Sequence, residues 1–99
     1  MDNQNKIQLD EIRERIDIVN LISKYIPVQK SGKNFSARCP FHNEKTPSFM
    51  ISPDLQRYKC FGCGKSGDIF TFVMDYEHVD FREALEKLAK EAGVKIVTA

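Results

Sequence analysis

The chain has 99 residues, of which 41% are hydrophobic and 29% are charged, and its formal net charge is +1. A chain of this length forms one domain with a thin core, and the composition is that of a soluble globular protein rather than a disordered one. The longest apolar run, IFTFVM, is far too short to span a bilayer, and no basic-then-apolar leader opens the sequence. We therefore expect a cytoplasmic protein with no membrane partner.

The small net charge hides an asymmetry along the chain. Residues 1–26 carry four basic and five acidic groups, net −1, and residues 67–99 carry four basic and seven acidic groups, net −3. Residues 27–66 carry seven basic and two acidic groups, net +5. A whole segment of one sign favours a contact surface for an anionic partner over a merely solvated surface.

The N-terminal quarter of the chain predicts helix, over about residues 8–26. Asp17 is a candidate N-cap, so the prediction includes a break near residues 15–17. Apolar residues recur at steps of three and four until Pro27 stops the run: Leu9, Ile12, Ile16, Val19, Ile22 and Ile26.

The hydrophobic period then changes to that of strands. VQKSGKNFSARC predicts a hairpin with Ser31–Gly32 in its turn, and PSFMIS and RYKC predict two further strands joined by the turn PDLQ. Strand alternation places Arg57 and Lys59 on one face of the last strand, and Tyr58 and Cys60 on the other.

Two helices are expected after GKSGD, over about residues 67–77 and 80–92. The first is apolar nearly all round and should be well buried. In the second, Asp80 and Glu83 have capping-box spacing, and Gly93 ends the helix. The predicted fold class is α+β: one domain, residues 1–99, in which a small antiparallel sheet of about residues 28–66 is flanked by an N-terminal helical segment and two C-terminal helices.

Four residues in the predicted sheet have the spacing of a zinc ribbon. Cys39-x2-His42 is followed, seventeen residues later, by Cys60-x2-Cys63, and a tetrahedral Zn²⁺ accepts a Cys3His set of this kind. A two-residue gap lets one tight turn offer two side chains to one ion. Four protein ligands leave no open position, so we expect one structural Zn²⁺ and no catalytic residue. An odd number of cysteines also argues against a secreted disulfide framework.

Other interpretations of these motifs are weaker. CFGC resembles a redox CxxC, but the partner Cys-x2-His and the missing βαβ context argue against that function. A zinc deaminase needs a proline directly before its CxxC, where Lys59 stands. A phosphate-binding loop needs a glycine at that same position. The remaining histidine, His78, is expected to be solvent-exposed rather than a fifth ligand.

The motifs CPFHNEKTPSF and CFGCGKSGD closely resemble the N-terminal zinc-binding domain of bacterial DnaG-type DNA primases, and the resemblance covers about residues 8–95. Primases are template-directed RNA polymerases that make short primers for DNA replication. The resemblance implies a bacterial, cytoplasmic zinc ribbon that binds single-stranded DNA template. It also implies a separate polymerase domain, in the same or a neighbouring chain, and a replicative helicase contacted only through a further domain that this sequence lacks.

The chain by itself is expected to be non-catalytic, because its sequence shows no paired-carboxylate motif of the kind that binds Mg²⁺. It is therefore either a fragment of a primase or a standalone relative. The alternative function is a standalone zinc-ribbon module for nucleic-acid binding or protein interaction, without priming activity.

Basic and aromatic residues of the central segment are candidates for contacts with DNA, because basic groups neutralise phosphates and aromatic rings stack on unpaired bases. Candidate phosphate contacts are Lys30, Lys33, Arg38, Lys45, Arg57 and Lys59. Candidate stacking residues are Phe35, Phe49, Tyr58 and Phe61. Core and stacking roles are equally open for Phe49 and Phe61, whereas Tyr58 is expected to be partly exposed.

Overall fold

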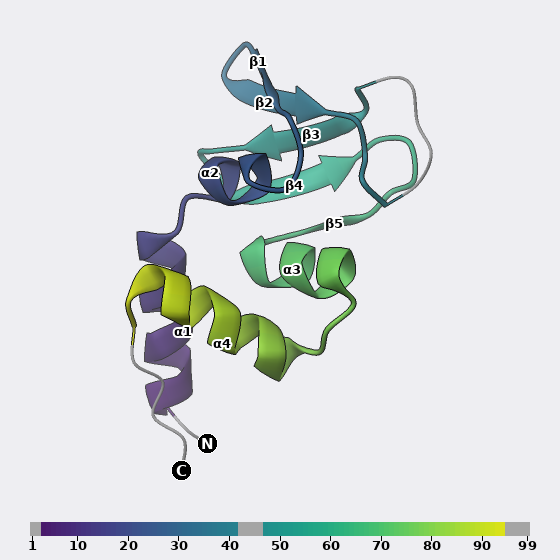
Figure 1. The fold of residues 1–99 in the computed structure, drawn as a ribbon. Coiled ribbons are helices and arrows are strands. Elements are labelled where there is room, and N and C mark those ends of the chain that lie inside the picture. The colour runs from purple at the N-terminus through teal and green to yellow at the C-terminus, as the bar shows by residue number, and fades with distance from the viewer. Residues whose placement is uncertain (1–2, 42–46, 95–99) are drawn as a thin grey trace.

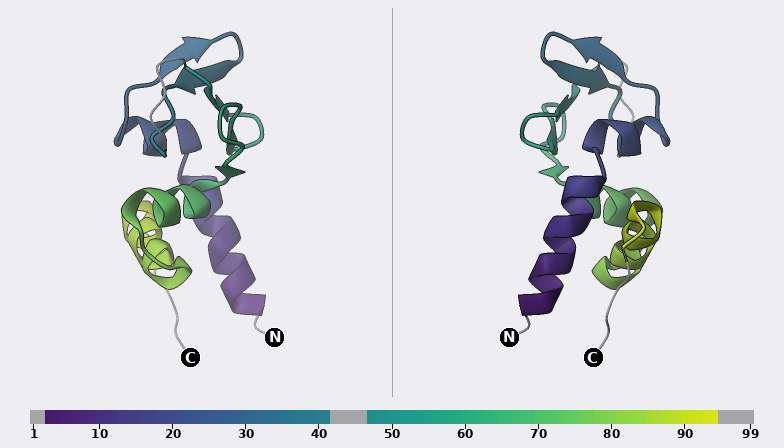
Figure 2. Two further views of the ribbon diagram at one scale, coloured as in Figure 1. Left: turned by 90° about the vertical axis from the view of Figure 1, so that its right-hand side faces the viewer. Right: turned by 90° about the vertical axis from the view of Figure 1, so that its left-hand side faces the viewer.

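The structure is a computed structural model that describes residues 3–41 and 47–94. A five-stranded antiparallel sheet forms one end of the molecule, and helices form the other end (Figure 1). The side views in Figure 2 show α2 beside the sheet, with α1, α3 and α4 beyond it. Among the described residues, no helix is long and apolar enough to cross a membrane.

The predicted N-terminal helical segment consists of two helices, α1 (Asn3–Arg15) and α2 (Ile18–Ser23). The predicted break is confirmed: Asp17 has extended backbone angles, and its side chain accepts a hydrogen bond from the Asn20 N–H at 3.1 Å. Helix α1 begins earlier than expected, because neither glycine nor proline interrupts the polar stretch before the apolar stripe.

Five strands follow one another across the sheet in chain order: β1 (Gln29–Ser31), β2 (Asn34–Ala37), β3 (Phe49–Ser52), β4 (Arg57–Cys60) and β5 (Ser66–Gly67). Ser31 pairs with Asn34, so the hairpin turn is Gly32–Lys33 rather than the predicted Ser31–Gly32. Gly32 takes a φ of +64°, which glycine adopts without steric cost. The sequence does not predict β5, because a two-residue strand has no period.

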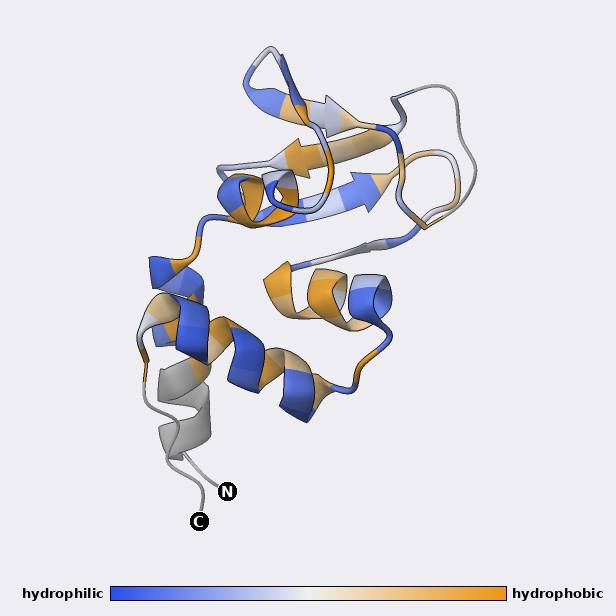
Figure 3. Ribbon diagram, viewed as in Figure 1, coloured by the Kyte–Doolittle hydropathy of each residue, from blue (hydrophilic) through white to orange (hydrophobic). Residues whose placement is uncertain are grey.

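The two faces of the sheet differ in character. On the inner face, side chains of Phe49 and Ile51 join those of α2 and α3 in a single core, and Figure 3 shows α3 as mostly hydrophobic. The strand register places the other residues on an outer face. One row across that face consists of Gln29, Ser36, Met50, Lys59 and Ser66, and beside it lie Ser31, Asn34, Ser52 and Arg57.

Tyr58 is buried, and the expectation that it is partly exposed is wrong. Only 2% of the residue is accessible to solvent. Its ring stacks on Phe49 with centroids 5.0 Å apart and meets Phe72 edge-on at 5.7 Å. The physical reason is strand alternation, which places Tyr58 on the inner face together with Cys60. In this position the ring cannot stack on a nucleic-acid base.

The two C-terminal helices are α3 (Ile69–Glu77) and α4 (Phe81–Ala92). The predicted cap of α4 is confirmed, since the Asp80 side chain accepts a hydrogen bond from the Glu83 N–H at 2.9 Å. Gly93 ends this helix in the left-handed conformation, also as predicted. His78 follows α3 and is exposed, which confirms the expectation for that residue.

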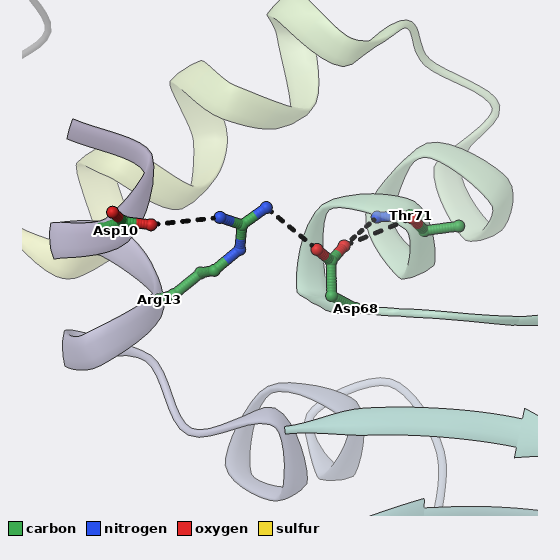
Figure 4. A network of polar contacts seen from close by, with 4 residues as sticks. All are labelled: Asp10, Arg13, Asp68 and Thr71. Carbon is green, nitrogen blue, oxygen red and sulfur yellow. Dashed lines mark hydrogen bonds and ion pairs between the residues drawn. The ribbon is translucent and has the colours of Figure 1, made fainter. Parts of the chain in front are cut away.

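Arg13 connects α1 to the start of α3 (Figure 4). Its guanidinium lies 3.2 Å from Asp68 and 3.4 Å from Asp10, and Asp68 accepts hydrogen bonds from the backbone and hydroxyl of Thr71. Burial acts to raise the pKa of Asp68, but the Thr71 amide and Arg13 outweigh burial, so the pKa falls below its ordinary value. Asp68 therefore stays ionised as the N-cap of α3.

Gln56, in the turn between β3 and β4, connects the sheet to the break between α1 and α2. Its side-chain oxygen accepts a hydrogen bond from the Ile18 N–H at 2.8 Å. Its amide nitrogen donates to Asp17 at 3.0 Å and to the Pro53 carbonyl at 2.8 Å. Gln56 has a φ of +53°, which is unfavourable for a residue with a Cβ. These three bonds offset that cost.

The contacts and the positive φ of Gln56 predict that alanine destabilises the chain more than glycine does at position 56. Gln56→Ala should lower the free energy of unfolding by about 1–3 kcal/mol, because it leaves the Ile18 N–H without its partner. Gln56→Gly should be roughly 0.5–1 kcal/mol less destabilising than Gln56→Ala, because glycine removes the left-handed strain. Urea unfolding of the two variants measures the difference. An alanine variant as stable as the glycine variant would contradict this account.

Candidate metal centre

Three cysteines from two separate parts of the sequence meet at the end of the sheet. Cys39 follows β2, Cys60 ends β4, and Cys63 lies in the turn after β4. Their sulfur atoms all lie within 4.8 Å of one another, and those of Cys39 and Cys63 are 3.8 Å apart. Zinc–sulfur bonds of about 2.3 Å in a tetrahedron separate two sulfurs by about 3.8 Å. All three thiols are free, so the cluster has the size and chemistry that zinc requires.

The backbone after β4 forms a tight turn around the Cys60 sulfur. The Cys60 N–H donates to the Lys65 carbonyl, and the Gly64 N–H donates to the Cys60 carbonyl, both at 2.8 Å. Gly64 adopts a φ of +83°, which side-chain-bearing residues rarely take. The backbone amides of Cys63 and Gly62 act to lower the pKa of the Cys60 thiol. A sulfur that accepts amide hydrogen bonds is stabilised as a thiolate, the form that binds metal.

The pKa values of two of the thiols are shifted in opposite directions. Burial raises the pKa of Cys39 to about 12. Burial acts in the same direction on Cys60, but the two amides and the neighbouring thiols outweigh it and lower the pKa of Cys60 below its ordinary value. Three thiolates at this spacing repel one another, so complete deprotonation of the cluster requires a cation.

His42, the fourth predicted ligand, lies outside the described residues, and so does Lys45. The chain immediately before His42 is anchored in the core by Phe41. The Phe41 ring lies 5.7 Å from Phe72 and 6.1 Å from Phe49, between ring centroids. Phe41 is thereby held on the inner side of the sheet, two residues after Cys39.

The candidate DNA contacts do not share one face of the sheet. Arg57 and Lys59 are exposed on the outer face. Lys30 pairs with Phe35, and this pair belongs to the opposite face. Lys33 lies in the hairpin turn and Arg38 just after β2, and both are exposed. The structure therefore brings two of these basic residues together as neighbours on β4 and sets Lys30 apart from them.

The structure also separates the two phenylalanines whose roles the sequence leaves open. Phe49 is fully buried and belongs to the core, whereas 69% of Phe61 is exposed. Sequence reasoning missed Met50 and Ser66, the cross-strand neighbours of Lys59 on the outer face. Alternation within PSFMIS hints at Met50, but only strand pairing reveals that these residues adjoin Lys59.

Comparison with known proteins identifies the family. Residues 4–99 match the family described as CHC2 zinc finger. The chain belongs to the CHC2 zinc-finger family. The resemblance to the zinc-binding domain of bacterial DNA primases is confirmed, and a zinc ribbon with a structural zinc fits both the fold and the cysteine cluster.

The relatives are considerably longer proteins. A DNA primase of Pseudomonas putida KT2440 is 51% identical over 88 residues, which cover 89% of this chain and 13% of that protein. A DNA primase of Thermotoga maritima is 48% identical over 88 residues, with 89% and 16% coverage. The crystal structure of the zinc-binding and RNA polymerase domains of the Aquifex aeolicus primase superposes with a TM-score of 0.87 at 48% identity, covering 91% of this chain and 22% of that one. The chain thus spans less than a quarter of each of these relatives.

The cysteine cluster predicts that loss of one thiol disrupts the sheet. Cys60→Ser should lose zinc and much of the strand signal in circular dichroism while keeping part of the helical signal, because Cys60 belongs to β4 and its partner Cys39 follows β2. Chelation of the wild-type chain should produce the same spectrum. Elemental analysis should find about one zinc per wild-type chain. A variant with an unchanged spectrum and melting temperature would mean that the metal does not support the fold.

Proposed function

We propose that this chain is the template-binding module of a bacterial DNA primase. In this role it binds single-stranded DNA and supports RNA primer synthesis by a polymerase domain in the same or a neighbouring chain. The observation that carries the proposal is the pair of exposed basic side chains on β4, Arg57 and Lys59, on the outer face of the sheet. The long DNA primases among the relatives support it.

The outer face has the chemistry that a single strand requires. Its basic groups neutralise phosphates, and the counterions that are released drive binding. Around them lie the hydroxyls of Ser52 and Ser66, which can bond to base edges or phosphates. Met50 adds an adaptable apolar contact in the same row as Lys59.

The zinc ligands in this proposal are Cys39, His42, Cys60 and Cys63. The three cysteines already form a cluster of the right size, and the order of residue types in the family's description, one Cys, one His and two Cys, is the order along this chain. With four ligands the ion serves as a cross-link and leaves no position for substrate.

The two histidines of the chain provide a matched test of the ligand set. His42→Ala should weaken zinc binding by at least tenfold, because one of four bonds is lost. His78→Ala should retain the wild-type affinity, because His78 is an exposed residue at the end of α3. Competition with a chromogenic chelator measures both affinities. Equal zinc affinity in the two variants would exclude His42 from the ligand set.

The proposed DNA surface is tested by removing its two central charges. Arg57→Ala/Lys59→Ala should weaken binding of a labelled oligonucleotide and reduce the slope of log affinity against log salt by about 1.4, which is about 0.7 for each lost phosphate contact with a single strand. Fluorescence anisotropy at several salt concentrations measures both quantities, and zinc content should not change.

The control is Arg82→Ala/Lys90→Ala, which removes two exposed charges from α4. This double variant has the same net charge as the test variant and should bind like the wild type. If both double variants lose the same affinity, the effect is one of net charge. If neither loses affinity, the template is held elsewhere.

A further inference from the structure

Phe61 is a large aromatic residue that is exposed to solvent beside the candidate metal centre. It follows β4 directly, and 69% of the residue is exposed. Single exposed apolar residues are common on protein surfaces, so exposure alone indicates nothing. Phe61 differs from an ordinary surface residue in the rigidity of its backbone and in the charges beside it.

Backbone hydrogen bonds restrain the chain at and on both sides of Phe61. Its N–H donates to the Ser48 carbonyl at 2.9 Å, and the preceding N–H, of Cys60, donates to the Lys65 carbonyl at 2.8 Å. The Gly64 N–H closes the turn onto the Cys60 carbonyl. Because the backbone is held in this way, only the two side-chain torsions of the phenylalanine remain to be ordered when a ligand binds.

A positive charge lies next to the exposed ring. The Lys59 ammonium is 5.4 Å from the ring centroid, and Arg57 continues the same side of β4. An apolar partner protein that covered Phe61 would have to bury the Lys59 charge as well, which is costly. A nucleotide matches both features, because its base offers a flat π-surface and its phosphate offers a negative charge.

We propose that Phe61 is the residue on which a base of single-stranded DNA stacks, while Lys59 contacts the phosphate next to that base. The inference rests on the proposed function and deepens it, since it identifies the side chain that stacks on a base. It also relates the DNA contact to the metal, because the turn that carries Phe61 lies between Cys60 and Cys63.

The chain contains no tryptophan, so a single introduced tryptophan reports directly on stacking. In Phe61→Trp, addition of an oligothymidylate should quench the indole fluorescence in proportion to the binding seen by anisotropy. Phe81→Trp is the matched control, because Phe81 is 44% exposed on α4, away from the proposed surface. Its fluorescence should not change on addition of DNA.

Affinity measurements separate an aromatic contact from a merely apolar one. Phe61→Leu should weaken DNA binding by roughly 5- to 150-fold, the range that stacking on one base covers, whereas the salt dependence should stay that of the wild type. Phe61→Tyr should restore binding. Leu55→Ala should bind like the wild type, because Leu55 is as exposed as Phe61, at 71%, but cannot stack.

The outcomes distinguish this inference from the function on which it rests. If the wild type binds no single-stranded DNA, both fail. If the wild type binds and Arg57→Ala/Lys59→Ala weakens binding, but Phe61→Leu binds normally and the fluorescence of Phe61→Trp is not quenched, the stacking inference alone is overturned. A loss of affinity in Phe61→Leu that is accompanied by loss of zinc or a lower melting temperature also overturns it, because Phe61 would then support the fold.

Discussion

The close approach of three thiols is the constraint on which the sheet depends. Cys39, Cys60 and Cys63 place their sulfurs within 4.8 Å of one another, a spacing at which three thiolates repel. Zinc offsets this repulsion and cross-links the end of β2 to the end of β4. In a chain of 99 residues, whose core is thin, such a cross-link supplies stability that packing alone provides less readily.

Strand β4 carries both the metal centre and the proposed DNA surface. Its buried residues, Tyr58 and Cys60, pack into the core and the thiol cluster, and its exposed residues, Arg57 and Lys59, lie on the outer face. Because alternation in a strand couples the two faces, a strand held by the metal on one side presents its charges at fixed positions on the other. Gln56, in the turn directly before this strand, links β4 to the helix break.

Many local features of the fold can be predicted from the sequence, and the errors have identifiable causes. The break at Asp17, the cap at Asp80 and the two faces of β4 follow from short-range rules and are confirmed. The expected exposure of Tyr58 is wrong. That expectation assumes a role in base stacking, whereas strand alternation places Tyr58 on the buried face together with Cys60. The predicted hairpin turn is wrong by one residue because register depends on the partner strand.

By itself the sequence determined the zinc ribbon and the family, because doubled two-residue spacings and the motifs around them are local patterns of covalent neighbours. Only the tertiary structure decided which aromatic residues face solvent and on which face of the sheet Lys30 lies relative to Lys59. Phe49 and Phe61 look alike in sequence, yet one is fully buried and the other is 69% exposed. Lys30 and Lys59 belong to opposite faces. These differences arise from strand pairing and from helices that cover one side of the sheet, and both are contacts between residues far apart in the chain.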